Sequence, residues 1–424
     1  MEKKKMIMKE KAQEIAKDLS LWRRHLHQHP ELSFSEHHTA EFVAGLLEKI
    51  PGMKVERNAG YPTAVVGTLS SGDGPTVAVR ADMDALPIQE ENTTGYSSRI
   101  KGVMHACGHD AHTAIVLGVA HLLGDSFREE ELKGTIKFIF QPAEERADDT
   151  GSTGAPYMIR HGVLDGVGAV FALHMDPEYP YGCVKLHNGY SMANVDVFRA
   201  KIKGTGGHGA YPHLGTDPVW MLGNVLQAVY GITGRHVSSL DSAVISIGRV
   251  EAGSASNVIP AEVEVGGTVR TYKPEIRERT HKELQRAFSV AESLGGEAEL
   301  EITAEDPALY NSPEVNRMME SAIKGLYPDF QLADEPFGMG GEDFAHMAGT
   351  VPGAMFFLGC RPDPDRVRHL HTPFFDIDEN SLIAGAAILA ETARQYMKGE
   401  IEHATANNTE GCLESEAQDS FRRK

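Results

Sequence analysis

Side chains able to bind a metal ion are concentrated in one short segment of the chain. The segment reads His105-Ala-Cys107-Gly-His109-Asp110-Ala-His112 and leads into a predicted helix. A thiolate and an imidazole on either side of a glycine can converge on one ion from a loop. Both are ligands of borderline metals such as Zn²⁺. The alternative, a histidine-rich helix start with a structural cysteine, is less favoured because so many ligand-type residues lie so close together.

A pair of adjacent carboxylates, Glu144 and Glu145, follows the predicted strand Thr135–Phe140. Adjacent side chains at a strand end point in different directions, so one can bind a metal while the other holds a water as a general base. Acidic pairs commonly lie on solvated loops. This pair, however, ends a buried apolar strand, and open α/β sheets bind their ligands at the carboxyl ends of such strands.

Two histidines and two aspartates lie in similar places. His174 ends another predicted strand, and His371 precedes the predicted last helix. A lone histidine is more often a packed or exposed residue, but its position at a strand end favours a role for His174. Asp82 and Asp84 point the same way if the strand before them continues, and such an acid could orient a ligating imidazole.

A doubly wound sheet brings distant strand ends together along one edge, so these clusters can build one site. The candidate ligands are Cys107, His109, Glu145, His174 and His371. Five protein ligands exceed one closed tetrahedral zinc site. The set therefore suggests two ions that share a thiolate bridge. Two such ions can polarise a carbonyl and lower the pKa of an attacking water.

Short apolar strands alternate with helices in the segments that must position these residues. The pattern predicts an α/β fold with a mixed, mostly parallel sheet covered by helices on both faces. The predicted helices cover Glu10–His27, Ser35–Ile50, Ala111–Leu123 and Ser381–Met397. The predicted strands cover Thr76–Val79, Thr135–Phe140, Val167–Leu173 and Ala354–Leu358.

The middle of the chain, from about Met192 to Asp306, reads as strand, helix, strand, strand, helix, strand. Its first helix opens with Thr216-Asp217-Pro218, a capping residue followed by a proline at a position that needs no N–H. The βαββαβ order predicts an inserted ferredoxin-like satellite domain. The expected domains are residues 1–190 with 307–398, the satellite 191–306, and a polar tail 399–424.

Composition excludes several classes of protein. The formal net charge is −19, so the surface repels the phosphates of nucleic acid. No apolar run is long enough for a membrane span, and no signal peptide is expected. The 4 cysteines have no regular spacing, which indicates reduced thiols and a cytoplasmic location rather than a disulfide framework. A Rossmann dinucleotide enzyme is rejected because no G-x-G-x-x-G joins an early strand to a helix.

A series of motifs between Trp22 and Met397 points to one family. They are, in order, RADMDALPI, MHACGHDAHTA, FQPAEE, LHMDP, GTGGHGAYPHLGTDP, ASNVIP, GTVRT, GMGGEDFAHM and HTPFFDIDE. This series resembles the amidohydrolase branch of the dinuclear metallopeptidases related to aminoacylase and carboxypeptidase G. The branch includes hippurate hydrolases, N-acetyldiaminopimelate deacetylases and indole-acetyl-amino-acid hydrolases. Many relatives in the wider clan have His-x-Asp where this chain has Asp82-x-Asp84, and an aspartate bridge where it has Cys107.

The resemblance implies a role for each matching position in the site. It assigns the five candidate ligands to two divalent ions (Zn, Mn, Co or Ni) per subunit, Glu144 to the general base, and Asp84 to an active-site acid. The satellite histidine His208 would enter the partner subunit's active site in a homodimer or higher homo-oligomer. The positions matching substrate-binding residues are Asn257, Arg270, and Gly340 and Gly341 in the loop 338–344.

The activity that the resemblance implies is hydrolysis of the amide bond of N-acyl amino acids. The acyl group would be acetyl, benzoyl or a similar group. A dipeptidase or carboxypeptidase of the same clan is the alternative. A non-catalytic binding protein is disfavoured because the metal positions and Glu144 are all present.

Overall fold

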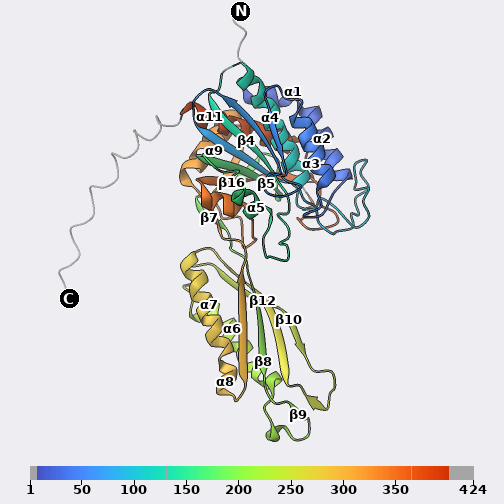
Figure 1. Ribbon diagram of the computed structural model, residues 1–424, viewed down its shortest axis with the longest axis vertical. Coiled ribbons are helices and arrows are strands. Elements are labelled where there is room, and N and C mark those ends of the chain that lie inside the picture. Colours follow the sequence, from blue (N-terminus) through green and yellow to red (C-terminus); the bar gives the residue numbers. More distant parts are fainter. Residues whose placement is uncertain (1–6, 130, 364, 401–424) are drawn as a thin grey trace, which may run out of the picture.

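The computed structural model describes residues 7–129, 131–363 and 365–400. Most of these residues surround one large mixed sheet (Figure 1). Its four central strands are parallel to one another, whereas β1, β2 and β6 each run antiparallel to a neighbour. The strands, in spatial order, are β1 (Lys54–Arg57), β2 (Val65–Ser71), β4 (Gly134–Gln141), β3 (Thr76–Asp82), β5 (Ala169–Pro180), β16 (Gly353–Arg361), β6 (Cys183–Lys185) and β15 (Gln331–Ala333).

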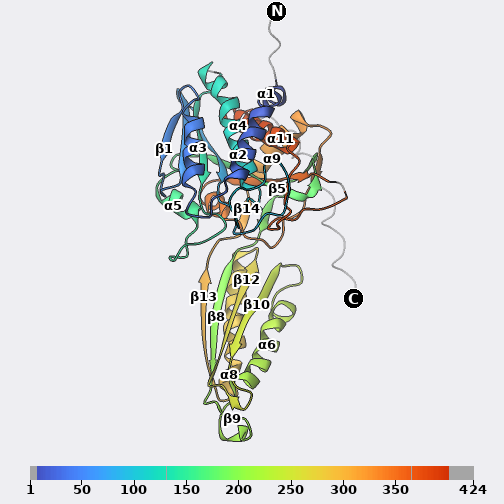
Figure 2. The ribbon, with the colours of Figure 1, turned by 90° about the vertical axis from the view of Figure 1, so that its right-hand side faces the viewer.

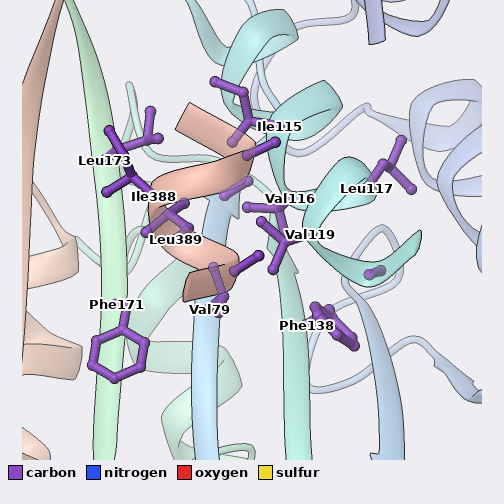
Figure 3. Close-up of a cluster of buried hydrophobic side chains, with 14 of the residues drawn as sticks. Val79, Ile115, Val116, Leu117, Val119, Phe138, Phe171, Leu173, Ile388 and Leu389 are labelled. Carbon is purple, nitrogen blue, oxygen red and sulfur yellow. The ribbon is translucent and has the colours of Figure 1, made fainter. Parts of the chain in front are cut away.

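Helices cover both faces of this sheet because the side chains of each central strand alternate between two apolar cores. Phe138 and Phe171 point into the larger core, against α4 and α11, as Figure 3 shows. Ile139 and Val170 point into the smaller core. The helices of the larger core are α1 (Met8–Glu14), α2 (Ala16–Gln28), α3 (His37–Leu47), α4 (His109–Arg128), α9 (Pro313–Leu326) and α11 (Asn380–Lys398); those of the smaller core are α5 (Gly154–Arg160) and α10 (Phe344–Thr350).

A second, antiparallel sheet extends away from the first as an arm (Figures 1 and 2). Its strand order is β10-β12-β8-β13. The first strand of the unit, β8, lies in the centre beside the last strand, β13, which forms one edge, as in a ferredoxin-like unit. Asp217 caps the first helix by accepting hydrogen bonds from Val219 N and Trp220 N. The elements are β8 (Asp196–Lys203), α6 (Pro218–Arg235), β10 (Ala243–Ala252), β12 (Glu262–Thr271), α7 (Pro274–Phe288), α8 (Val290–Ser293) and β13 (Glu297–Ala304).

Three short features complete the described fold. The pairs β7 (Gly189–Met192) with β14 (Leu309–Asn311) and β9 (Gly207–His208) with β11 (Val258–Ile259) form two small sheets, and Pro212–Leu214 is a 3-10 turn. Within the part of the chain that the structure describes, no helix is both long and apolar enough to cross a membrane.

The predicted fold class is confirmed, including the mixed sheet and the inserted βαββαβ unit. The exact domain boundaries stay predictions, and most of the predicted tail, 401–424, lies outside the described residues. The predicted first helix, Glu10–His27, is two helices separated at Ile15, whose φ of −95° and ψ of 9° interrupt the helical backbone.

Candidate metal centre

The five predicted ligands lie together at one edge of the large sheet. Cys107 and His109 flank the start of α4, where Gly108 has a φ of +92° that a side chain would disfavour. His174 lies on β5 next to Phe357 of β16. The loops that follow β4 and β16 bring in the other two ligands, Glu145 and His371.

Distances between the ligand atoms divide them into two groups that share one sulfur. Cys107 Sγ lies 3.5 Å from His174 Nε2 and 3.3 Å from His371 Nε2. Glu145 Oε1 lies 3.2 Å from His371 Nε2 and 3.8 Å from His109 Nε2. Cys107 with His109 and His174, and Cys107 with Glu145 and His371, are therefore each compact enough to surround one ion.

These spacings fit metal ligation. With usual zinc bond lengths and a tetrahedral angle, a sulfur and an imidazole nitrogen on one ion are about 3.6 Å apart, close to the two Cys107–histidine distances. His109 Nε2 and Glu145 Oε1 are buried without a hydrogen-bond partner. A buried polar atom without a partner is unfavourable unless something else satisfies it, and a metal ion does so.

The protein fixes which nitrogen of two candidate histidines faces the centre. His174 Nδ1 is 2.8 Å from the Met175 carbonyl oxygen, which can only accept, so Nδ1 carries the proton and Nε2 is free to ligate. His109 Nδ1 is 3.3 Å from Asp84 Oδ1. Partners of this kind set the tautomer of a ligating imidazole.

His112 is fixed in the opposite sense, although it belongs to the same motif. Its Nε2 accepts a hydrogen bond from Met175 N at 2.9 Å, so its Nδ1 carries the proton and donates to Asp82 Oδ1 at 2.7 Å. Asp82 also pairs with Arg80 Nη1 at 2.7 Å. Because both of its ring nitrogens are hydrogen-bonded, His112 has no nitrogen free for a metal ion and instead holds Asp82 and the backbone of Met175 in place.

Asp84 joins the acidic turn to the histidine motif. Its carboxylate accepts the backbone N–H groups of Glu144 and Glu145 at 3.1 and 3.0 Å, and the hydroxyl of Ser33 at 2.6 Å. Its Oδ1 also faces His109 Nδ1. The two aspartates therefore have different partners, since Asp84 faces His109 Nδ1 and Asp82 accepts from His112 Nδ1.

The electrostatics of the centre favour positive charge. Burial lowers the pKa of His109, but Asp82, Asp84 and Glu145 together raise it to about 10. Burial raises the pKa of Glu144 well above its ordinary value, and Glu342 and Glu145 raise it further. A position that holds positive charge this strongly suits a divalent cation.

No role was predicted for a buried group of charged residues beside Glu144, which consists of Arg80, Glu342 and Asp343. Arg80 Nη2 lies 3.1 Å from Glu342 Oε1 and 2.8 Å from Asp343 Oδ1. Gln141 holds Arg80 Nε at 2.9 Å. These residues do lie in the motifs that indicated the family: Arg80 is the first residue of RADMDALPI, and Glu342 and Asp343 lie in GMGGEDFAHM.

A cavity of about 640 Å³ opens beside the ligands, between the large sheet and the base of the arm. Arg270, at the end of β12, lines it and donates to the Met339 carbonyl oxygen at 3.3 Å. Gly340 and Gly341 also line it. A Cβ on Gly341 would lie 2.3 Å from Val195 Cγ2, so this close approach requires glycine.

Two predicted site residues, His208 and Asn257, do not join the centre of their own chain. Both are exposed and lie in or next to the β9–β11 pair. Gly209 N donates to the Asn257 carbonyl oxygen at 2.8 Å, which keeps the two segments together. Strand β9 lies at the end of the arm farthest from the large sheet (Figures 1 and 2).

Comparison with known proteins identifies the family. Residues 78–395 match the profile of peptidase family M20/M25/M40. The chain belongs to this family. An N-acetylcysteine deacetylase of Bacillus subtilis (strain 168) is 39% identical over 381 residues, covering 88% of this chain and 94% of the relative. Thermostable carboxypeptidase 1 of Saccharolobus solfataricus is 37% identical over 399 residues, covering 92% of this chain and 99% of the relative.

A solved structure agrees with this assignment. A Bacillus subtilis protein described as a dinuclear metal-binding peptidase from the M20 family has a TM-score of 0.79 at 35% identity, covering 91% of this M20 chain and 99% of that protein. The predicted family resemblance and the predicted class, a metal-dependent amidohydrolase, are both confirmed.

Proposed function

We propose that this M20 chain hydrolyses the amide bond of N-acyl amino acids, releasing a carboxylic acid and a free amino acid. The carrying observation is that two ligand groups share Cys107 while the carboxylate of Glu144 lies beside them. The N-acetylcysteine deacetylase relative supports the substrate class.

Two divalent ions are the proposed cofactor, held by the five residues Cys107, His109, Glu145, His174 and His371. When bound, they supply Lewis-acid polarisation of the acyl carbonyl and make the attacking water more acidic. Zinc, manganese, cobalt and nickel are the candidate ions, because thiolate and imidazole suit the softer ones. The thiolate must stay reduced, which favours a reducing compartment such as the cytoplasm.

Glu144 is the proposed general base. It takes a proton from the attacking water and returns it to the nitrogen of the leaving amine, so that water is added across the C–N bond. Burial raises the pKa of Glu144 and the carboxylates around it raise this pKa further, so Glu144 binds the transferred proton more firmly.

Arg270 and the glycine-rich loop are the proposed binding site for the amino-acid part of the substrate. The Arg270 guanidinium can pair with the substrate carboxylate. Gly340 and Gly341 let the backbone approach the bound molecule closely.

His208 and Asn257 are proposed to act in a partner subunit's site. Strand β8 has 8 residues and is about 25 Å long, and His208 lies beyond its far end. Arg270, at the near end of the arm, already lines the cavity. Rotation of a rigid arm about its base keeps the tip that far from the base, so it does not bring His208 to its own metal centre. A homodimer or higher homo-oligomer, assembled through the satellite 191–306, would supply the histidine.

The alternative function is that of a dipeptidase or carboxypeptidase, as the name of the Saccharolobus relative suggests. A panel of N-acetyl amino acids, N-benzoylglycine and dipeptides separates the two activities. Release of amino acids from the acylated compounds, and not from dipeptides, is the expected result. Preferential cleavage of dipeptides would favour the alternative.

Substitution of the proposed base tests the mechanism. Glu144→Gln should lower kcat by about 10²–10⁴-fold while both metal ions are retained, because an amide accepts no proton from water. Amine release measures turnover, and elemental analysis measures the metal. Asp149→Asn, an exposed change on the same loop, is the matched control. Unchanged turnover in Glu144→Gln would remove Glu144 from this role.

A further inference from the structure

Glu36, a residue outside the predicted site, has a fully buried carboxylate close to the acidic turn. Its Oε1 accepts the backbone N–H groups of Phe34 and Ala143, each at 2.9 Å. Its Oε2 accepts the hydroxyl of Thr63 at 2.8 Å. The two backbone N–H groups can only donate, so the atom in the position of Glu36 Oε1 must be an acceptor.

The two backbone groups held by Glu36 both belong to residues in an unfavourable conformation. Phe34 has a φ of +67° and Ala143 a φ of +50°, although neither is glycine. A residue with a side chain adopts this left-handed region at a cost, and it persists where the surroundings enforce it. Glu36 Oε1 thus bonds two strained positions at once.

The strained Ala143 is the first residue of the turn that carries Glu144 and Glu145. Three successive N–H groups of this turn point at carboxylates, the first at Glu36 and the next two at Asp84. The Ala143 carbonyl accepts from Gly154 N at 2.8 Å on the other side. The directions of both glutamate side chains therefore depend on how firmly this turn is held.

We propose that Glu36 is a positioning residue, whose bond to the Ala143 N–H sets the direction of Glu144 and Glu145. The proposal rests on the proposed function for the roles of those two glutamates. Glu36 acts through the backbone of the turn and touches neither substrate nor metal.

Glu36→Gln tests this assignment, with Glu31→Gln as the matched control. Glu31 lies on the same loop and also accepts three hydrogen bonds, from His38 N and from the N–H and hydroxyl of Thr39, but it faces the start of α3. In Glu36→Gln, a neutral amide replaces the carboxylate, so the N–H groups of Phe34 and Ala143 lose a charged acceptor and keep at most a weaker one. We expect kcat to fall about 10- to 100-fold with KM changed less than about twofold, and Glu31→Gln to leave both near wild type.

Hydrogen exchange gives a readout that needs no substrate. The amides of residues 143–145 should exchange at least about tenfold faster in Glu36→Gln, because the turn opens more often, and at the wild-type rate in Glu31→Gln. Ala143→Gly should restore several-fold of the lost kcat in the Glu36→Gln background, since glycine adopts the left-handed region freely. Glycine at this position also relieves strain in the wild-type chain, so urea unfolding of each variant must show that the rescue exceeds a general gain in stability.

The outcomes separate the possibilities. Wild-type exchange at residues 143–145 in Glu36→Gln, or loss of activity that Ala143→Gly leaves unrescued, would overturn the proposal. If Glu36→Gln does not fold, the milder Thr63→Val replaces it; faster exchange of the turn is expected, and unchanged exchange overturns the proposal. A wild-type enzyme inactive on every substrate would contradict the proposed function, whereas the exchange rates would still decide the role of Glu36.

Discussion

Asp110, which directly follows His109, anchors the start of α4 to the rest of the large core. Its Oδ2 accepts hydrogen bonds from Arg23 Nε and His27 Nδ1, both at 2.8 Å. Arg23 reaches on to Asp376 Oδ1 at 3.1 Å. Asp110→Asn keeps the size of the side chain and removes its charge, so it weakens the link between α4, α2 and the segment before α11.

The structure gives the size of the effect. Breaking a buried ion pair costs about 3–5 kcal/mol. Arg23 keeps Asp376 as a partner, so we expect the lower end, about 3 kcal/mol, as loss in the free energy of unfolding. In a chain that already carries Arg23→Met, Asp110→Asn should lower the free energy of unfolding by less than it does in wild type, because the ion pair is already broken. The expected coupling is about 2 kcal/mol, within the range for residues in contact.

Urea unfolding at neutral pH measures these values. Asp125→Asn, in an exposed pair with Arg128 on the same helix, is the control and should change stability by less than about 0.5 kcal/mol. A loss in Asp110→Asn no larger than in this control would refute the reasoning. A loss in the double variant equal to the sum of the losses in the two single variants would also refute it.

The effect of pH provides a second check. Burial raises the pKa of Asp110, but Arg23 and His27 outweigh burial and hold it well below its ordinary value. A carboxyl with a depressed pKa in the folded state stabilises fully above its unfolded pKa of about 3.9, and the stabilisation is lost as pH falls below that value. The difference between wild type and Asp110→Asn should therefore shrink below about pH 4. It should also decrease as pH rises above about 6.5, because burial and Arg23 lower the pKa of His27 but Asp110 and Glu90 hold it above its ordinary value.

Two further predictions concern the metal centre and the arm. Cys107→Ser should lower the bound metal from two ions per chain to one or fewer, because both ligand groups lose their shared sulfur; Cys183→Ser is the control, and retention of both ions would exclude the bridge. His208→Ala should lower kcat by about 10²–10³-fold with metal retained. Mixing it with Glu144→Gln should restore up to about a quarter of wild-type activity through mixed dimers; no recovery after subunit exchange would argue against a histidine shared between subunits.

The sequence predicted which loops meet, because a parallel sheet places the carboxyl ends of its strands along one edge. Glu145 illustrates this, since it follows β4, whereas His174 lies within β5, which continues beyond the predicted end at Leu173 to Pro180. The helix itself was predicted, but over Ala111–Leu123, whereas α4 begins directly after Gly108 at His109 and continues to Arg128.

Other features depend on contacts that no local pattern encodes. Glu36 and Ala143 are 107 positions apart in the sequence, and their hydrogen bond exists only in the folded chain. Asp82 is the last residue of β3 and Asp84 lies beyond it, so the strand does not continue as far as expected. The surrounding donors, Arg80 for Asp82 and Ser33 for Asp84, distinguish the partners of the two acids. The place of His208 is set by the length of the arm, which spacing along the chain does not reveal.

The charges of the centre explain why ligands, base and supporting acids form one system. The carboxylates in and around it are Asp82, Asp84, Glu144, Glu145, Glu342 and Asp343. Among the described side chains, Arg80 forms ion pairs with Asp82, Glu342 and Asp343, while His109 faces Asp84 and His371 faces Glu145. Burial raises the pKa of Glu144 and this excess of negative charge raises it further, whereas bound cations would lower it. The strength of Glu144 as the proposed base therefore depends on its burial and on the balance between the neighbouring acids and the ions that the centre would hold. Glu342→Gln, a change in an acid that also lines the cavity, should consequently lower the pKa of Glu144 and shift the acid limb of the pH profile of kcat to lower pH; an unshifted profile would contradict this balance.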